Sequence, residues 1–169
     1  MSLQKLWAPW RQPYITRANR KGSVGCFLCQ IARSRRDTQN LVLTRGHQAF
    51  SLLNLFPYNN GHLLVAPYRH TGEIGALDER ERLELFDLMD DGITRLKKVL
   101  KPHGFNVGLN LGRAAGAGIP DHLHWHIVPR WIGDTNFMPI CADTKVVSQS
   151  LRAALAQLKK VKVTPRISG

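Results

Sequence analysis

The sequence is short of acidic residues. Twelve Asp and Glu stand against 24 Lys and Arg among 169 residues, which gives a net charge of +12. This charge favours a polyanionic partner such as a nucleotide or nucleic acid, although it also fits general solubility. The basic residues spread along the chain, with clusters at 33–36, 97–101 and 159–162. A diffuse distribution argues against a dedicated DNA surface, so we expect no nucleic-acid partner.

Long apolar runs and an even set of cysteines are also missing. No stretch of about 18 apolar residues is present, which argues against a membrane-spanning helix. Residues 1–15 lack the apolar segment of a signal peptide. The chain has three cysteines, and an odd number without a secretory signal argues against a disulfide framework. We therefore expect a cytoplasmic protein with no membrane partner, in which the isolated Cys141 is a small buried residue.

The length suits one domain with terminal extensions. We expect an irregular N-terminal arm over residues 1–25, a domain over 26–140, and a C-terminal helix with a basic tail over 141–169. Apolar patterns and turn residues predict a short helix after Gly25. They also predict four strands, over 49–55, 62–68, 106–112 and 122–129. These elements predict an α+β fold, an antiparallel sheet with helices packed on one face.

Two longer helices are predicted. One spans 78–101, because Asp78 is a good N-cap and Glu81 completes a capping box. Its expected apolar face is Leu83, Phe86, Met89, Ile93, Leu96 and Leu100. The other begins near Asp143 or Thr144, with an inner face of Val147, Leu151, Leu155 and Leu158.

Three histidines alternate with apolar residues in "IPDHLHWHIVPR". In a strand such alternation places His122, His124 and His126 on one face, which we expect to be exposed, with the intervening apolar residues in the core. A merely solvated face is the plain alternative, but histidine carries no reliable charge at pH 7. A row of imidazoles suits a transition metal, or a nucleophile oriented by its neighbours.

A glycine-rich segment, "GLNLGRAAGAGIPD", precedes these histidines. Small residues let backbone N–H groups approach a phosphate closely, although such a segment alone is often only a turn. Because it leads directly into the histidines in a strongly basic chain, it points to a phosphate held in front of an imidazole.

These stretches together resemble a known family. "HLHWHIV" resembles the motif of the histidine triad (HIT) nucleotide hydrolases and transferases. "NLFPYNNGHLLVAP" is similar to the family's hairpin with a fourth histidine, here His62, and "GLNLGRAAGAG" to its phosphate loop. The resemblance covers roughly 26–140. The segments "LWAPWR", "CFLC" and "VPRWIGDTNFMP" resemble most the branch of bacterial diadenosine tetraphosphate phosphorylases and hydrolases.

The resemblance implies a HIT fold with a sheet of about five strands, a homodimer whose two sheets join, and cleavage of dinucleoside polyphosphates at the α-phosphate. His124 would be the nucleophile that forms a nucleotidyl-histidine intermediate, oriented by the carbonyl of His122. His126 would contact the α-phosphate or the leaving group, and His62 would support the triad. The resemblance implies that Asn54 contacts the ribose. The implied phosphate contacts are Asn110, Gly112, Ala117 and Gly118. The candidate walls for the base, which could equally be ordinary core residues, are Leu28, Phe50, Leu52 and Leu53.

One position departs from the family pattern. Phosphorylase-like members have a serine after the glycine pair of the loop. This chain has Gly118 at that position, which weakens the prediction that the activity is phosphorolysis. His126, where the transferase branch has glutamine, favours hydrolysis or phosphorolysis over transfer to a sugar phosphate. The alternatives are a nucleoside phosphoramidase or DNA-adenylate hydrolase, and a nucleotide-binding sensor without turnover.

A zinc site is also expected. Cys26 and Cys29 have Cys-x-x-Cys spacing and need further ligands, for which His70 and His122 are the candidates. HIT-like relatives contain sites of this kind, whereas the plain alternative is two reduced cysteines. The family needs no Mg²⁺ for the chemical step, and no acidic pair suited to holding it is evident. The remaining histidines, His47 and His103, are expected to face solvent.

Overall fold

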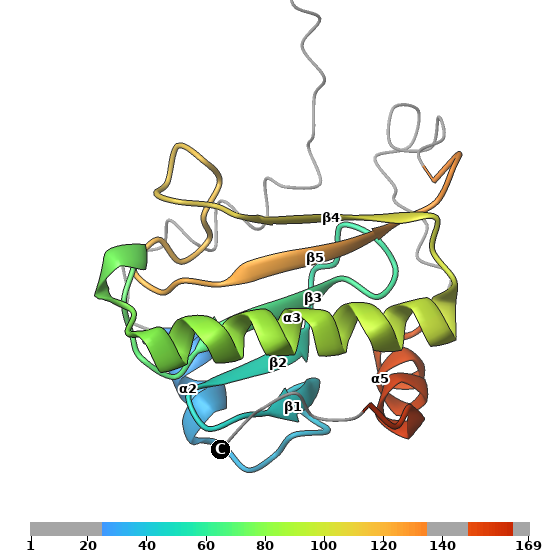
Figure 1. Cartoon of the computed structure of the whole chain (residues 1–169), viewed down its shortest axis with the longest axis horizontal. Coiled ribbons are helices and arrows are strands. Elements are labelled where there is room, and N and C mark those ends of the chain that lie inside the picture. Colours follow the sequence, from blue (N-terminus) through green and yellow to red (C-terminus); the bar gives the residue numbers. More distant parts are fainter. Residues whose placement is uncertain (1–24, 135–148, 164–169) are drawn as a thin grey trace, which may run out of the picture.

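A computed structural model describes residues 25–134 and 149–163, and a single antiparallel sheet organises them (Figure 1). The strand order is β1-β2-β3-β5-β4. The strands are β1 (Val42–Arg45), β2 (Ala49–Leu53), β3 (Leu63–Pro67), β4 (Gly104–Leu109) and β5 (Trp125–Arg130). The helices are α2 (Phe27–Arg33), α3 (Glu79–Leu100), α5 (Leu151–Lys160) and the 3₁₀ helix η2 (Ile74–Ala76). The predicted α+β class and five-stranded antiparallel sheet are confirmed, with β1 as a strand that sequence patterns had missed.

The helices cover both faces of the sheet, so the prediction that they share one face is wrong. Alternate residues of β2 point to opposite sides: Ala49 and Leu53 join the core under α3 and α5, whereas Phe50 and Leu52 join a second core with Leu28 of α2. All five residues of β2 are buried because both faces are covered. The seven-residue α2 was too short for its apolar periodicity to reveal which face it covers.

Helix α3 begins with the predicted capping box, in which Asp78 accepts from the Glu81 N–H and Glu81 accepts from the Asp78 N–H, both at 2.9 Å. The predicted apolar face is partly wrong, because Leu83 and Phe86 are 60% and 69% exposed. Met89 and Leu96 are buried as predicted, and Ile93 and Leu100 pack against the core, but Leu85, Leu88 and Gly92 take the places expected for Leu83 and Phe86. The first turns of the helix carry more apolar residues than one face holds, so periodicity alone chose the wrong residues there.

A buried carboxylate fastens α3 to the β1–β2 turn. Glu84 is 5% exposed and accepts hydrogen bonds from the backbone N–H groups of His47, Gln48 and Ala49. A Cβ at Gly46 would overlap this carboxylate, so the turn needs glycine at that position. Glu84 therefore caps the backbone of this turn from inside the molecule.

Helix α5 begins at Leu151, after Ser150, whose hydroxyl accepts from the Ala153 N–H. Leu155 and Leu158 are buried as predicted, and Leu151 is half-buried. The start expected near Asp143, together with Val147, Cys141, the N-terminal arm over 1–24 and the end of the basic tail, lies outside the described residues. Within the described residues, no helix has the length and apolar character needed to cross a membrane.

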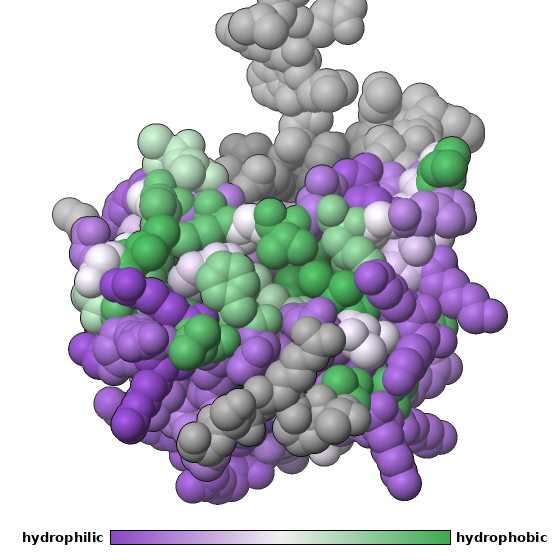
Figure 2. Space-filling view, viewed as in Figure 1, coloured by the Kyte–Doolittle hydropathy of each residue, from purple (hydrophilic) through white to green (hydrophobic). Residues whose placement is uncertain are grey.

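Apolar side chains gather over α3 and β4 (Figure 2). Val107 of β4 pairs with Ile127 and shares the face that α3 covers, yet Val107 is 48% exposed whereas Ile127 is fully buried. This difference arises because α3 packs on β2, β3 and β5. Together, Leu83, Phe86 and Val107 form an exposed apolar surface beside the edge strand of the sheet, which we call the α3–β4 surface.

Candidate functional site

The three clustered histidines do not form an exposed row. Strand β5 begins at Trp125, so only His126 belongs to it, and His122 and His124 lie in the irregular segment that precedes it. His122 is fully buried and His124 is 6% exposed, so the expectation of an exposed face is wrong for both. Leu123 and Ile127 are in the core as predicted. Burial of these two rings is tolerated because each makes a specific polar contact, which a sequence pattern does not reveal.

His124 has a defined tautomer. Its Nδ1 lies 2.8 Å from the backbone carbonyl oxygen of His122, so this nitrogen donates and a neutral ring carries its lone pair on Nε2. Burial lowers the pKa of His124, and the hydrogen bond to the carbonyl opposes that shift only in part. The ring is therefore held neutral, as a nucleophile requires.

A second chain of hydrogen bonds fixes His126. The Tyr58 backbone N–H donates to Nδ1 of His62 at 3.0 Å, so Nε2 of a neutral His62 carries the proton. This Nε2 lies 2.9 Å from Nδ1 of His126, which must accept. Neutral His126 then carries its own proton on Nε2. The two neighbouring histidines thus present opposite functions, a lone pair on His124 and an N–H donor on His126.

Four side chains that the sequence singled out for a metal come together: Cys26, Cys29, His70 and His122. Their ligand atoms all lie within 4.8 Å of one another. Nδ1 of His122 is 3.1 Å from the Cys26 sulfur, 3.5 Å from the Cys29 sulfur and 3.2 Å from Nδ1 of His70. Two thiolates and two imidazoles at these separations suit a tetrahedral ion such as zinc. The cluster could therefore hold a metal ion.

The surroundings of His122 match this role. Its Nε2 lies 2.9 Å from the carbonyl oxygen of Pro67, so the proton sits there and the Nδ1 lone pair faces the sulfurs. Metal-bound histidines commonly donate their other N–H to a carbonyl in this way. Burial lowers the pKa of His122, which favours the neutral ring that binds metals, and burial raises the pKa of the Cys26 thiol.

Arg45 anchors the helix that carries the two cysteines. From β1 its guanidinium donates to the carbonyls of Ile31, Ala32 and Ser34 at the end of α2, at 2.7–3.2 Å, and to the carboxylate of Asp37. Carbonyls at a helix end otherwise lack partners. This role was not predictable from the sequence, because a single arginine in a strand carries no signal of such a contact.

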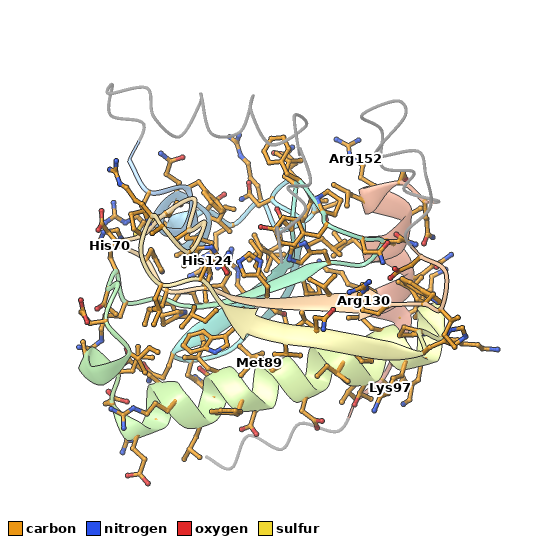
Figure 3. The ribbon with its side chains drawn as sticks, turned by 90° about the horizontal axis from the view of Figure 1, so that it is seen from above. His70, Met89, Lys97, His124, Arg130 and Arg152 are labelled. Atoms are coloured by element: carbon orange, nitrogen blue, oxygen red, sulfur yellow. The ribbon has the colours of Figure 1, made fainter. Side chains whose placement is uncertain are left out.

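Two cavities flank the histidines. One of about 660 Å³ is bordered by His70, Gly72, Gly112 and Asp121. The other, of about 490 Å³, lies on β4 and β5 and includes His126. Figure 3 shows His70 and His124 toward one end of the sheet, Arg130 further along β5, and Met89 and Lys97 on the opposite side, on α3.

Residues of the predicted phosphate loop border both cavities. Asn110 borders the cavity with His126, and Gly112 borders the one with His70. Gly112 and Gly116 adopt left-handed φ values of 74° and 87°, which favour glycine. The Ala117 N–H already donates to the Gly112 carbonyl at 3.2 Å, so in this conformation it turns into the loop rather than toward a ligand. Gly118 is half-buried.

The predicted contacts for ribose and base divide into two groups. Asn54 lies beside the triad, with its side-chain nitrogen 3.4 Å from Nδ1 of His62. Leu28, Phe50 and Leu52 share one core beneath α2 and are at most 3% exposed. Leu53 lies on the opposite face of the sheet under α3, so the structure does not bring it to the others. As predicted, His47 and His103 are exposed.

Known proteins resemble this chain. The model of the HIT domain family matches residues 35–131. Over 156 residues, 89% of this chain and 80% of the relative, the chain is 44% identical to the AP-4-A phosphorylase of Mycobacterium tuberculosis strain H37Rv. Over 101 residues, 60% of this chain and 55% of the relative, it is 31% identical to the asymmetrical bis(5'-nucleosyl)-tetraphosphatase of Schizosaccharomyces pombe. A crystal structure of a Zn-bound histidine triad family protein from Mycobacterium smegmatis gives a TM-score of 0.59 at 26% identity, covering 81% of this chain and 97% of that one.

Proposed function

Because the chain belongs to the HIT domain family and is a HIT-type nucleotide-processing enzyme, we propose that it cleaves dinucleoside polyphosphates such as diadenosine tetraphosphate at the α-phosphate. The observation that carries the proposal is the fixed tautomer of His124, whose Nδ1–H is held on the His122 carbonyl. This contact leaves the Nε2 lone pair of a buried, neutral ring for attack on phosphorus.

In the first step Nε2 of His124 attacks the α-phosphorus and forms a P–N bond. The bond from phosphorus to the bridging oxygen breaks, and its electron pair leaves with the polyphosphate, which is ATP when the substrate is diadenosine tetraphosphate. His126 donates its Nε2–H to the phosphoryl or departing oxygen, where negative charge develops. The hydrogen bond from His62 keeps that proton on Nε2 of His126.

In the second step an acceptor removes the nucleotidyl group from His124. Inorganic phosphate as acceptor would release ADP, and the similarity to a protein named AP-4-A phosphorylase supports this outcome. Water as acceptor would release AMP. The absence of a serine hydroxyl at Gly118 favours water as the acceptor, because phosphorylase-like members place that hydroxyl donor beside the phosphate. Of the two, we propose phosphorolysis, since the similarity extends over most of the chain.

A product assay tests the proposal. The 169-residue chain is incubated with diadenosine tetraphosphate, with and without inorganic phosphate, and the nucleotides are separated. ADP plus ATP that appears only with phosphate supports phosphorolysis, whereas AMP plus ATP in both cases means that water resolves the intermediate. No cleavage in either condition would contradict the proposal and would direct attention to phosphoramidates, adenylylated DNA or a sensor without turnover.

We also propose that Cys26, Cys29, His70 and His122 bind zinc. When bound, the ion would supply a structural cross-link between α2 and the segment that leads into β5. The His122 carbonyl that accepts from His124 belongs to the same residue, so the ligand set and the nucleophile share one backbone position. We therefore expect that disorder in α2 would disturb the orientation of His124, because both depend on His122.

We further propose a homodimer through the α3–β4 surface. Strand β4 ends the strand order, so its outer edge is unpaired among the described residues. Leu83, Phe86 and Val107 remain 48–69% exposed beside it. An edge strand next to exposed apolar side chains is a surface that proteins normally cover. A second copy would pair β4 with β4 and continue the sheet, in agreement with the family resemblance.

A further inference from the structure

Two free cysteines lie close together at the start of α2. Cys26 is the N-cap residue, and its carbonyl accepts the first helical hydrogen bond, from the Gln30 N–H at 3.1 Å. Cys29 follows three positions later, so helix geometry puts the two Cα atoms about 5 Å apart. A disulfide requires Cα atoms roughly 4.4–6.8 Å apart. Since the two sulfurs lie within 4.8 Å of one another, this pair can form a disulfide with little movement of the backbone.

The two sulfurs differ in their surroundings. The Cys29 sulfur lies 3.3 Å from Nδ1 of His70, which is an exposed residue. The Cys26 sulfur lies 3.1 Å from Nδ1 of His122, which is fully buried. Figure 3 shows His70 at the left edge of the molecule and His124 further in. Because both cysteines are only half-buried among the described residues, a small oxidant can reach Cys29 from the side of His70, with Cys26 behind it.

We propose that Cys26 and Cys29 are a site of reversible oxidation by hydroperoxides, at which formation of a disulfide expels the bound metal. The proposal rests on the zinc site proposed above and deepens it, because a purely structural cross-link would not respond to an oxidant. Cys29 is the sulfur that meets the peroxide, and Cys26 is the sulfur that closes the disulfide. Two thiols at this separation can be oxidised to a disulfide and reduced again by thiol exchange.

The oxidation takes two steps. The Cys29 thiolate attacks one peroxide oxygen, so that an S–O bond forms and the O–O bond breaks. The other oxygen leaves with the electron pair and takes a proton from solvent, which gives water or an alcohol. The Cys26 thiolate then attacks the sulfur of the Cys29 sulfenic acid, so that an S–S bond forms, the S–O bond breaks and hydroxide leaves. The two sulfurs together lose two electrons, and the peroxide gains them.

The disulfide cannot do what the two thiolates do. Zinc binds the thiolate form of cysteine, and sulfurs joined in a disulfide no longer carry that charge. Only His70 and His122 would remain of the four ligands, so the ion leaves. A disulfide also has no hydrogen to donate, whereas a thiol can donate to the His122 ring. Oxidation therefore leaves His70, at 3.2 Å, as the one remaining donor to Nδ1 of His122 within this cluster, and it weakens the link between α2 and the segment before β5.

The test follows the metal and the thiols together. The 169-residue chain with Cys141→Ser, in which only these two cysteines remain, is loaded with zinc and treated with hydrogen peroxide. About one zinc per chain should reach a chromogenic chelator at the rate at which the two thiols disappear. The product should be lighter by two hydrogen atoms and should melt about 5 °C or more below the zinc-loaded protein. A phosphine reductant followed by zinc should restore both properties, and the same protein with catalase added before the peroxide is the control.

Two variants distinguish the sulfurs. Cys26→Ser and Cys29→Ser are each made in the Cys141→Ser background and treated with peroxide and dimedone, which traps sulfenic acids. Cys26→Ser should give the adduct at Cys29, because no second thiol can displace the hydroxyl group. Cys29→Ser should give about fivefold less adduct, because its sulfur lies on the buried side. Equal or reversed trapping would overturn the assignment of Cys29 as the attacking sulfur.

The outcomes separate this proposal from the earlier ones. Zinc that stays bound while the peroxide oxidises N-acetylcysteine in the same solution overturns the oxidation site and leaves the zinc proposal intact. Zinc that is released without loss of both thiols also overturns it, because the metal then leaves for another reason. A chain that takes up no zinc contradicts both proposals. None of these measurements uses nucleotide cleavage, so the function proposed for His124 is tested separately. They also need no serine variant of Cys26 or Cys29, so they decide the proposal even if those variants fail to fold.

Discussion

The buried carboxylate of Glu84 offers a sharp test of how the fold is held together. It accepts three backbone N–H groups from the β1–β2 turn, and the residue is 5% exposed. In Glu84→Gln the amide oxygen can serve Gln48 and Ala49, whereas the NH₂ group then faces the N–H of His47. The substitution keeps the shape of the side chain and removes both the charge and one acceptor.

The size of the effect follows from these contacts. One donor loses its partner and two charge-assisted hydrogen bonds become neutral, which together cost about 3 kcal/mol of unfolding free energy. For a chain of this length such a loss lowers the melting temperature by about 6–12 °C. Glu79→Gln is the matched control, because this carboxylate lies on the same helix and is exposed. It should cost about 0.5 kcal/mol, mainly through its position in the first helical turn.

Thermal unfolding of the two variants and the wild type, followed by circular dichroism in the same buffer, measures the difference. Equal melting temperatures for Glu84→Gln and Glu79→Gln would show that the three hydrogen bonds contribute nothing net, and the internal-cap argument would then be wrong. Gly46→Ala should destabilise by a similar mechanism, since its methyl group displaces the same carboxylate.

Three further predictions concern the site and the assembly. His124→Ala should abolish cleavage of diadenosine tetraphosphate while calorimetry still detects nucleotide binding, and normal turnover would refute the assignment of the nucleophile. Purified protein should contain about one zinc per chain by elemental analysis, and Cys26→Ser should lose both the metal and thermal stability; metal-free wild-type protein that melts at the same temperature would remove the zinc site. Phe86→Glu should shift the mass found by light scattering toward that of the monomer. It should not lower the melting temperature of the isolated chain, because the side chain is 69% exposed. The control Glu79→Gln should leave the mass unchanged.

The candidate site was predictable where the signal is local. Spacing alone suggested Cys26 and Cys29 as a pair, and the resemblance to the HIT family supplied His62 as a fourth histidine. The role of Arg45 was not predictable, because it depends on where the end of α2 lies relative to β1. Tyr58 was missed for the same reason: its backbone N–H fixes His62, which in turn acts on His126 from another strand.

By itself the sequence determined the elements and their chemistry. The capping box of α3 and the loop glycines each need only neighbours within a few positions, so their physical effect can be read from spacing. Tertiary structure decided which face each element buries. It placed α2 on the face opposite α3 and buried His122 and His124, because burial depends on what packs against a side chain. It also fixed the two ring tautomers, since a ring proton is assigned by a hydrogen-bond partner, and for His126 the partner, His62, lies far away in the sequence, just before β3.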